Sequence, residues 1–367
     1  MKKNISAILF TLIAISAAPL ISIGINNSAY DGYTDKNTFT IHQDSKTKKA
    51  SATENTVAES TSFSAPSEKA SDTKQRTKSS AVQNLSFKIY DKAVKSIITV
   101  SDFDFCCGAV MTETDLDIPY EALKAEIIAL HTYYSYIRNE SRAENKSFDF
   151  ECNTKVWETY VSESELKEKL RDTFSESYDT VKNAVSEVSD TFVVFDGKPC
   201  MTKYFEISSG KTFSYKEIFG SDISYLRSVP SPLDVTANNY KTKISLSPKE
   251  FDDKLKKYFG SYSPEKEISE NIKNISKTEN NAVSSVEIGN IKADGGKLTE
   301  IFSLRSRCFD ISYGNELYTF TVCGCGENIG MSKFGACRMA EQGSNFKEIL
   351  RHYFPSAEIK SSFSPVD

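Results

Sequence analysis

Carboxylates are the side chains in this sequence best suited to chemistry. The 367 residues include 50 Asp and Glu but only three histidines, His42, His131 and His352. These are too few for a mechanism that needs a cluster of histidines. One carboxyl group can act first as acid and then as base if apolar neighbours raise its pKa. Glu113 meets this condition best, because it follows the apolar run 109–111. On the residue types alone, a surface residue at the end of a strand fits Glu113 better than an acid does.

Two other charged residues near Glu113 in the sequence are weaker candidates. Glu121 lies in the first turn of an expected helix, where the helix dipole stabilises the charged form and lowers the pKa. Glu121 is therefore the second choice for the acid. Lys124 on the same helix can position a substrate, pair with a carboxylate or simply face solvent.

The composition excludes two classes of protein. Lys and Arg total 45 against 50 Asp and Glu, a net charge of -5, so no global positive field exists to bind nucleic acid. A hydrophobic content of 39% and a mean hydropathy of -0.40 exclude a polytopic membrane protein. One membrane anchor remains possible.

The N-terminal segment has the features of such an anchor. An uncharged apolar stretch, residues 5–25, follows Lys2 and Lys3. Its length fits an uncleaved anchor, whereas Pro19 and the small residues 16–18 fit a cleaved signal peptide. The positive end stays in the cytoplasm. We therefore expect a single-pass, extracytoplasmic protein, or a secreted one if the segment is cut.

The rest of the chain divides by composition into linker, domain and tail. Residues 26–84 are rich in Ser, Thr, Lys, Ala and Glu and have few large apolar side chains. Such a segment cannot bury enough surface to offset its ordering entropy, which predicts a disordered linker. One folded domain is expected over residues 85–357, followed by a tail, 358–367.

Local signals in this domain predict an α+β fold, because helices and strands are mixed without regular βαβ alternation. Apolar periodicity and capping boxes mark the helices, and a two-residue turn marks one hairpin. Residues 262–284 are polar and are expected to form a surface excursion. Strands are expected in 86–100, around Asp196-Gly197, and in 284–291, 307–313 and 316–322. Helices are expected after Pro119 (stripe Leu123, Ile127, Leu130, Tyr134), from Ser162 (stripe Leu166, Leu170, Phe174, Tyr178, Val181), from Ser247 and over 345–353.

The sequence contains eight cysteines, an even number that permits disulfides in an oxidising compartment. Cys323 and Cys325 share a strand face, and Cys308 is expected on a neighbouring strand. A bridge from Cys308 to one of them and buried free thiols are equally compatible with the sequence.

Three segments in this order resemble one known family. They are residues 108–136 (GAVMTETDLDIPYEALKAEIIALHTYYSY), 204–234 (YFEISSGKTFSYKEIFGSDISYLRSVPSPLD) and 324–354 (GCGENIGMSKFGACRMAEQGSNFKEILRHYF). They resemble the stage II sporulation protein D family and its amidase-enhancer relatives. The resemblance implies a lytic transglycosylase that cuts peptidoglycan glycan strands during engulfment of the forespore. It also implies a cell-wall amidase and membrane proteins of the engulfment machinery as partners.

The resemblance assigns roles to particular residues. Glu113 matches the family's glutamate, which implies the acid and base of the reaction. Ser332 belongs to the family's C-terminal signature, and Glu327 stands where the family usually has a histidine. The resemblance implies substrate binding for both, and it leaves open a second acid or a site without turnover at Glu327. The segment that resembles a small-residue loop lining the family's cleft, and so implies substrate binding, comprises Ser208, Ser209, Gly210, Lys211 and Thr212.

Departures from the family pattern affect the metal and the activity. Some relatives bind zinc through Cys and His, but only Cys152 is kept here, and Val156 and Trp157 occupy the other two positions. A closed zinc site needs four ligands, so we predict no metal and no cofactor. His131 replaces the family's arginine. These departures keep two alternatives open: a non-catalytic glycan-binding or amidase-enhancing module, and a secreted structural domain with no role at the cell wall.

Overall fold

The computed structural model describes residues 85–114, 116–171 and 174–363. The expected anchor and linker, residues 1–25 and 26–84, lie outside the described residues. Among the helices that are described, none has both the length and the apolar character needed to cross a membrane.

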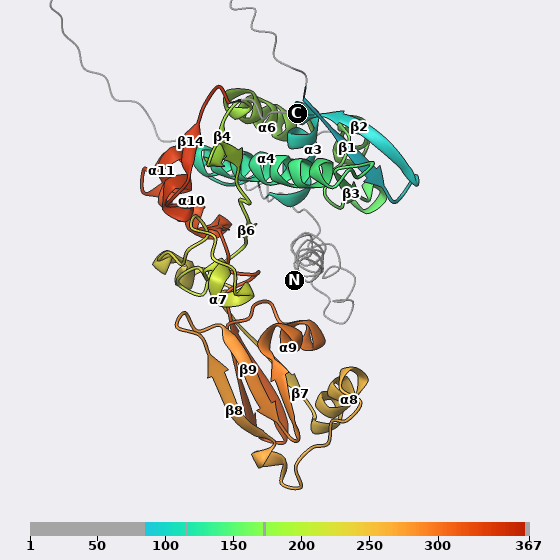
Figure 1. Ribbon diagram of the computed structural model, residues 1–367, viewed down its shortest axis with the longest axis vertical. Coiled ribbons are helices and arrows are strands. Elements are labelled where there is room, and N and C mark those ends of the chain that lie inside the picture. Colours follow the sequence, from blue (N-terminus) through green and yellow to red (C-terminus); the bar gives the residue numbers. More distant parts are fainter. Residues whose placement is uncertain (1–84, 115, 172–173, 364–367) are drawn as a thin grey trace, which may run out of the picture. The chain divides into compact units, whose positions relative to one another are not determined.

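The described chain is a mixed α+β structure, which confirms the predicted fold class (Figure 1). The helices are α3 (Asp102–Glu113), α4 (Tyr120–Ala143), α5 (Glu163–Leu170), α6 (Phe174–Val188), α7 (Tyr215–Phe219), α8 (Pro248–Tyr258), α9 (Gly295–Phe302), α10 (Lys333–Glu341) and α11 (Phe346–Tyr353). The strands are β1 (Ser86–Asp91), β2 (Ser96–Ser101), β3 (Phe150–Cys152), β4 (Phe192–Phe195), β5 (Lys198–Pro199), β6 (Tyr204–Phe205), β7 (Lys241–Leu246), β8 (Ile272–Lys277), β9 (Val283–Ile288), β10 (Ile291–Asp294), β11 (Phe309–Gly314), β12 (Leu317–Cys323), β13 (Met331–Ser332) and β14 (Glu358–Lys360).

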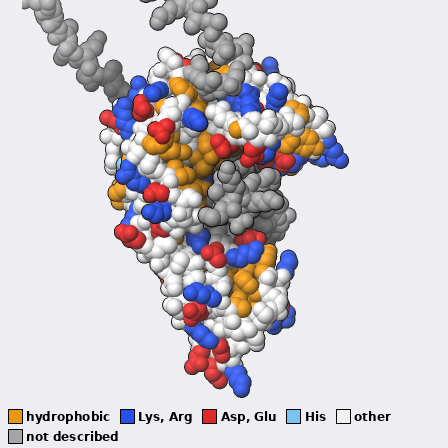
Figure 2. Space-filling view, viewed as in Figure 1, with side chains coloured by type: hydrophobic (Ala, Val, Ile, Leu, Met, Phe, Trp, Pro, Cys, Tyr) orange, Lys and Arg blue, Asp and Glu red, His pale blue; other side chains and the backbone are white. Residues whose placement is uncertain are grey.

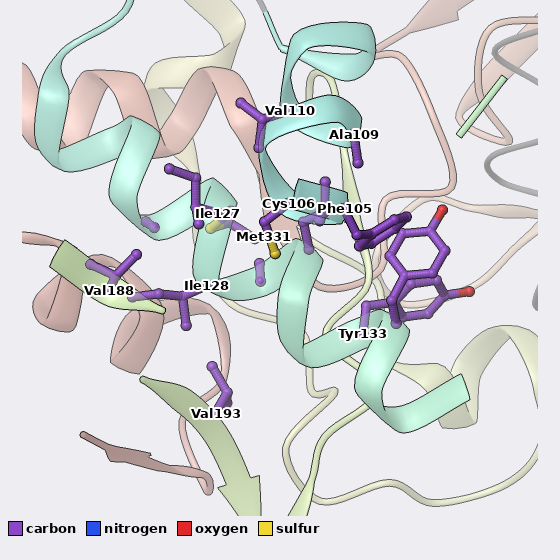
Figure 3. Close-up of a cluster of buried hydrophobic side chains, with 14 of the residues drawn as sticks. Phe105, Cys106, Ala109, Val110, Ile127, Ile128, Tyr133, Val188, Val193 and Met331 are labelled. Atoms are coloured by element: carbon purple, nitrogen blue, oxygen red, sulfur yellow. The ribbon is translucent and has the colours of Figure 1, made fainter. Parts of the chain in front are cut away.

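One hydrophobic core is built around α4. This helix packs against α3, α6, α10 and α11, and most of its residues are buried, as expected of a helix covered on several sides. Short sheets in the orders β2-β1-β3, β14-β4-β5 and β13-β6 complete this part of the molecule. Figure 3 shows side chains from several elements meeting here: Phe105, Cys106, Ala109 and Val110 of α3, Ile127, Ile128 and Tyr133 of α4, Val188 of α6, Val193 of β4 and Met331 of β13.

A second core lies in the segment between β6 and β13. It is formed by the antiparallel sheets β11-β12-β7 and β10-β9-β8 together with α8 and α9. Phe251 of α8 stacks on Tyr318 of β12 with ring centroids 4.1 Å apart, and the ring of Phe320 lies 4.6 Å from that of Phe302. Hydrogen bonds tie this segment to the first core, for example from Asn280 Nδ2 to Glu217 Oε2 at 2.6 Å.

Several predicted elements are confirmed. Capping boxes at Ser162, Ser247 and Asn345 start α5, α8 and α11. The hairpin of β4 and β5 turns at Asp196-Gly197, where both residues have positive φ, as a type I′ turn requires. By contrast, the fold continues past the predicted domain end at residue 357, because β14 lies in the expected tail and pairs antiparallel to β4.

Three predictions about elements are wrong. The apolar stripe from Leu166 to Val181 belongs to two helices, because the backbone leaves the helical region at Arg171 with φ 47°. Residues 262–284 include strand β8, which pairs with β9, so they are no mere surface excursion. Glu113 ends a helix, α3, and not a strand.

Acidic and basic side chains are interspersed over the face of the molecule shown in Figure 2, in keeping with the small net charge of the chain. All eight cysteines are free. Four of them, Cys106, Cys107, Cys152 and Cys200, are buried as small hydrophobic residues, and the other four are half-buried.

Candidate active site

Glu113 is the last residue of α3, and α3 is fixed at both of its ends. Ser101 caps the N-terminus by accepting a hydrogen bond from Asp104 N at 3.1 Å. At the C-terminus, the Nζ of Lys333 donates to the backbone oxygen of Glu113 at 2.5 Å, and the hydroxyl of Tyr204 donates to Glu113 Oε2. The side chain of Glu113 is therefore held between α3, β6 and α10.

The surroundings of Glu113 favour its protonated form. Burial raises its pKa to about 7, against the lowering effects of the Tyr204 hydrogen bond and the charge of Lys333. Oε1 is inaccessible to solvent, and no described residue lies within hydrogen-bond distance of it. A carboxyl group with a pKa of about 7 is partly protonated near neutral pH, as a general acid requires.

Lys333 joins three elements at this point. It is the first residue of α10 and forms an ion pair with Glu206 at 2.7 Å, beside its bond to the end of α3. Burial by itself would lower the pKa of Lys333, but Glu206, Glu126 and Glu113 raise it. Lys333 is thus a fixed positive charge beside Glu113.

Glu327 forms an ion pair and lies near Tyr133 of α4. Its carboxylate pairs with the buried ammonium of Lys203 at 2.7 Å. Burial raises the pKa of Tyr133, and the charges of Glu327 and Glu113 both add to the rise. Two of the predicted site residues, Glu113 and Glu327, therefore both lie near Tyr133.

The predicted loop 208–212 is fixed by hydrogen bonds within the protein. The backbone nitrogen of Ser208 and the hydroxyl of Ser332 both donate to Asp234 Oδ2, at 2.5 and 2.6 Å. Ser209 N donates to Asn328 Oδ1 at 2.8 Å. Thr212 is buried, whereas Ser209, Gly210 and Lys211 are half-buried. Gly210 has φ 104°, which an L-residue with a side chain rarely adopts.

The backbone around Ser208 and Ser332 depends on Asp234. Besides these two bonds, the hydroxyl of Ser231 donates to Asp234 Oδ1 at 3.1 Å. Asp234→Ala removes the acceptor of the Ser208 backbone nitrogen, while the Ser231 and Ser332 hydroxyls keep contacts with the Tyr353 hydroxyl and the backbone oxygen of Glu206. A buried donor without an acceptor costs about 1–3 kcal/mol, and we expect the free energy of unfolding to fall by about this amount in urea titrations. The exposed Asp222→Ala is the control and is expected to stay within about 0.5 kcal/mol of the parent; equal effects in the two variants would contradict the assigned role.

Glu121 and Lys124 make a different set of contacts. The carboxylate of Glu121 accepts a hydrogen bond from Phe346 N, the first residue of α11, at 2.8 Å. Lys124 pairs with Glu121 and lies 3.6 Å from Glu187 of α6. These contacts hold the start of α4 against α11 and α6. This is a structural role, which the sequence had left open for both residues.

Two other positions considered in the sequence analysis, His131 and Cys152, are occupied by buried side chains. His131 is buried in the first core, where its Nε2 lies 3.0 Å from Asp102 Oδ2 and its ring packs on Phe192. Cys152 is buried in β3, and Val156 is exposed. Within the described ranges, no three His, Cys, Asp or Glu side chains come together in a way that could hold a metal ion.

Tyr204, Lys203, Lys333 and Tyr133 were not predicted as site residues. Tyr204 is 91 positions from Glu113 and Lys333 is 220 positions from it, so no local spacing connects them. The only signal was that all four lie inside or beside the three segments that resemble the family.

Titration of Glu113 has a measurable effect on stability. Because its pKa is about 7 in the folded chain and 4.5 ordinarily, the folded state binds the extra proton between these values. The contribution of Glu113 to stability is therefore present below pH 4.5 and is lost as the pH rises to about 7. Above this range Glu113→Gln is expected to exceed the parent in unfolding free energy by up to about 3 kcal/mol. Urea titrations of both proteins at pH 5 and 8 test this; a difference independent of pH would contradict it.

Comparison with known proteins gives a consistent answer. Residues 90–195, which contain Glu113, match the sequence model of a family described as stage II sporulation protein. Stage II sporulation protein D of Bacillus amyloliquefaciens is 26% identical over 281 residues, 76% of this chain and 80% of that protein. The protein of the same name from Bacillus subtilis (strain 168) is 26% identical over 280 residues, with the same shares. An uncharacterized protein of Brachyspira hyodysenteriae is 26% identical over 292 residues, 75% of this chain and 71% of that protein.

The family match covers the first of the three segments, residues 108–136, which contains Glu113. Residues 90–195 thus match the SpoIID family of stage II sporulation proteins, and over about three quarters of its length the chain is a distant homologue of stage II sporulation protein D.

Proposed function

We propose that this protein is a lytic transglycosylase that cleaves peptidoglycan glycan strands during the remodelling of the cell wall in sporulation. The observation that carries the proposal is the carboxyl group of Glu113, which has a pKa of about 7 and a buried Oε1 with no described partner. The match to the SpoIID family supports the cell-wall context.

A single carboxyl group is sufficient for this reaction. Glu113 gives its proton to the oxygen that links MurNAc to GlcNAc, and the bond between that oxygen and C1 of MurNAc breaks. The resulting carboxylate takes the proton of the C6 hydroxyl of the same MurNAc, whose oxygen then bonds to C1. The product carries a 1,6-anhydro ring, and Glu113 is protonated again. A hydrolase would need a second carboxylate to activate water or act as nucleophile.

The neighbours of Glu113 suit both halves of this cycle. The Tyr204 hydroxyl and the Lys333 ammonium stabilise the carboxylate once the proton has left. Burial opposes this effect and keeps the resting pKa near 7, which is close to the value at which a group serves well as both acid and base.

We assign substrate binding to the loop 208–212 and to Glu327 by resemblance to the family. The backbone of Gly210 carries no side chain, so a sugar can approach it closely. Glu327 acts together with Lys203, since their ion pair leaves the carboxylate as an acceptor for sugar hydroxyls and not as a second acid. The substrate is a strand without stem peptides, which a cell-wall amidase must supply.

The site of action follows from the N-terminal sequence. In this proposal residues 5–25 anchor the chain in the membrane and the linker 26–84 carries the domain to the wall. Protease treatment of intact protoplasts is expected to remove the domain while cytoplasmic proteins survive. Protection of the domain would contradict an extracytoplasmic location.

Product analysis tests the proposed activity. The full-length chain is incubated with glycan strands that lack stem peptides, and the products are examined by mass spectrometry. We expect MurNAc ends that are lighter by one water than hydrolytic ends, because the anhydro ring forms without water. Hydrolytic ends would indicate a different mechanism, and unchanged strands would indicate a protein without this activity.

One observation favours a second candidate, a non-catalytic glycan-binding or amidase-enhancing module. Glu327, which stands in place of the family's histidine, is engaged by Lys203, and His131 is buried beside Asp102. Neither residue supplies the chemical group of the family residue that it replaces, the histidine ring at 327 or the arginine guanidinium at 131. This candidate predicts binding to purified sacculi and faster amidase action without anhydro ends.

A further inference from the structure

Cys308 directly precedes β11, and Cys323, the last residue of β12, lies opposite it. β11 and β12 pair antiparallel with Phe309 opposite Val322, which places the next residues, Cys308 and Cys323, in register. The backbone nitrogen of Cys323 donates to the oxygen of Cys308 at 2.8 Å. Side chains at such a pair point to the same face of the sheet.

The hydroxyl of Ser306 fixes this pair further. It donates to the oxygen of Cys323 at 2.5 Å and accepts a bond from Cys308 N at 3.0 Å, so it bridges these two backbone groups. Directly opposite residues of paired antiparallel strands have Cα atoms about 4.5–5.5 Å apart. Disulfides span Cα distances of about 4.4–6.8 Å, most often about 5.5–6 Å.

Both thiols are half-buried and lie in a small cluster with Ser209 and Tyr240. Burial raises the pKa of Cys308 to about 11, and the neighbouring Cys323 adds to the rise, while a hydrogen bond with Ser209 opposes it. Tyr240 bonds to Cys323 and, through its hydroxyl, to the backbone oxygen of Ser209 at 3.2 Å. The two thiols are therefore close enough to influence each other and lie against the loop 208–212.

We propose that Cys308 and Cys323 form a disulfide by thiol–disulfide exchange with a low-molecular-weight disulfide, and that this bond fastens the ends of β11 and β12 beside the loop 208–212. One cysteine thiolate attacks a sulfur of the small disulfide, forms a mixed disulfide and displaces one small thiolate. The second cysteine thiolate attacks the protein sulfur of the mixed disulfide and displaces the other. The two cysteines lose two electrons and two protons, and the small disulfide becomes two thiols.

The pair differs from the other half-buried cysteines in its surroundings. Cys325 follows Gly324, which has φ 80° and breaks the strand, and the thiol of Cys325 interacts with Arg305. Cys337 lies on α10. Cys325 is thus a matched control, two residues from Cys323 but without the opposite thiol.

Oxidised glutathione and mass spectrometry test the proposal on the folded, full-length chain. After oxidation at pH 8.5, free thiols are alkylated and the chain is cleaved after Lys, Arg and Glu. Cleavage at Glu316 separates residues 308–316 from 317–327, so the two fragments stay joined only by a disulfide. We expect joined fragments in the parent and in Cys325→Ser, and separated fragments in Cys308→Ser and Cys323→Ser. A bond to Cys325, a persistent glutathione adduct or no bond at all would overturn the proposal.

Thermal unfolding provides a second readout that does not depend on the proposed activity. A disulfide here closes a loop that includes the β11–β12 turn and restricts the unfolded chain. We expect the oxidised parent to unfold several degrees above its reduced form, and Cys323→Ser to show no such difference. Joined fragments without a rise in unfolding temperature would mean that the bond strains the strand ends, and would overturn the fastening role.

Discussion

Glu113→Gln is expected to abolish the formation of 1,6-anhydro ends while the chain stays folded. Gln has nearly the same shape as the protonated carboxyl group but cannot give up a proton. General acid–base catalysis contributes about 10²–10⁴-fold to a rate, so we expect a loss of at least about 100-fold. The measurement is the rate at which anhydro ends appear from strands without stem peptides, and circular dichroism checks the fold.

Glu121→Gln separates the two acid candidates. The carboxylate of Glu121 accepts a hydrogen bond from α11 and pairs with Lys124, so its loss should affect stability more than turnover. Full activity in Glu113→Gln together with lost activity in a folded Glu121→Gln would reverse the assignment. Binding of both variants to sacculi, measured in the same experiment, distinguishes lost chemistry from lost substrate binding.

Arg138→Ala is expected to cause the largest loss of stability. Arg138 is buried and donates from Nη1 to both oxygens of Asp102, at 2.8 and 3.0 Å, and its guanidinium lies 4.5 Å from the ring centroid of Phe87. Burial by itself would raise the pKa of Asp102, but His131 and Arg138 outweigh it and hold the pKa below the ordinary value. Removal of one partner from a buried ion pair costs about 3–5 kcal/mol, measurable as the free energy of unfolding in urea.

An exposed ion pair serves as the control for Arg138. Lys249 and Asp253 pair at 2.7 Å on the surface of α8, and such pairs contribute little. Lys249→Ala should therefore leave the unfolding transition nearly unchanged. If Arg138→Ala behaved in the same way, Asp102 would have to be protonated or hydrated in the folded chain, which would contradict its role as a buried, ionised partner of Arg138.

The sequence predicted those elements whose signals are local. A capping box needs only four consecutive residues, and Ser162, Ser247 and Asn345 each start a helix as expected. The helix α3 was missed because it is covered on several sides: Phe105, Cys106, Cys107 and Val110 are all buried, so no apolar stripe reveals the period. The break at Arg171 was missed because the apolar residues of α5 and α6 continue one stripe across it.

The candidate site could be predicted only in part. Glu113 was found because it lies in a segment that resembles the family and follows an apolar run. Its partners Tyr204 and Lys333 come from distant parts of the chain. Nothing in their residue types distinguishes them from other tyrosines and lysines of the sequence. The same holds for Glu327, whose ion pair with Lys203 depends on the meeting of two segments 124 positions apart.

The bond from Lys333 to the end of α3 has a consequence for when the protein becomes active. A chain that crosses a membrane from its N-terminus exposes Glu113 early, but the lysine that holds its helix arrives 220 residues later. Until then the C-terminal end of α3 lacks its bond to Lys333. For the proposed exported enzyme, we therefore expect no cleavage of glycan strands until translocation has passed Lys333.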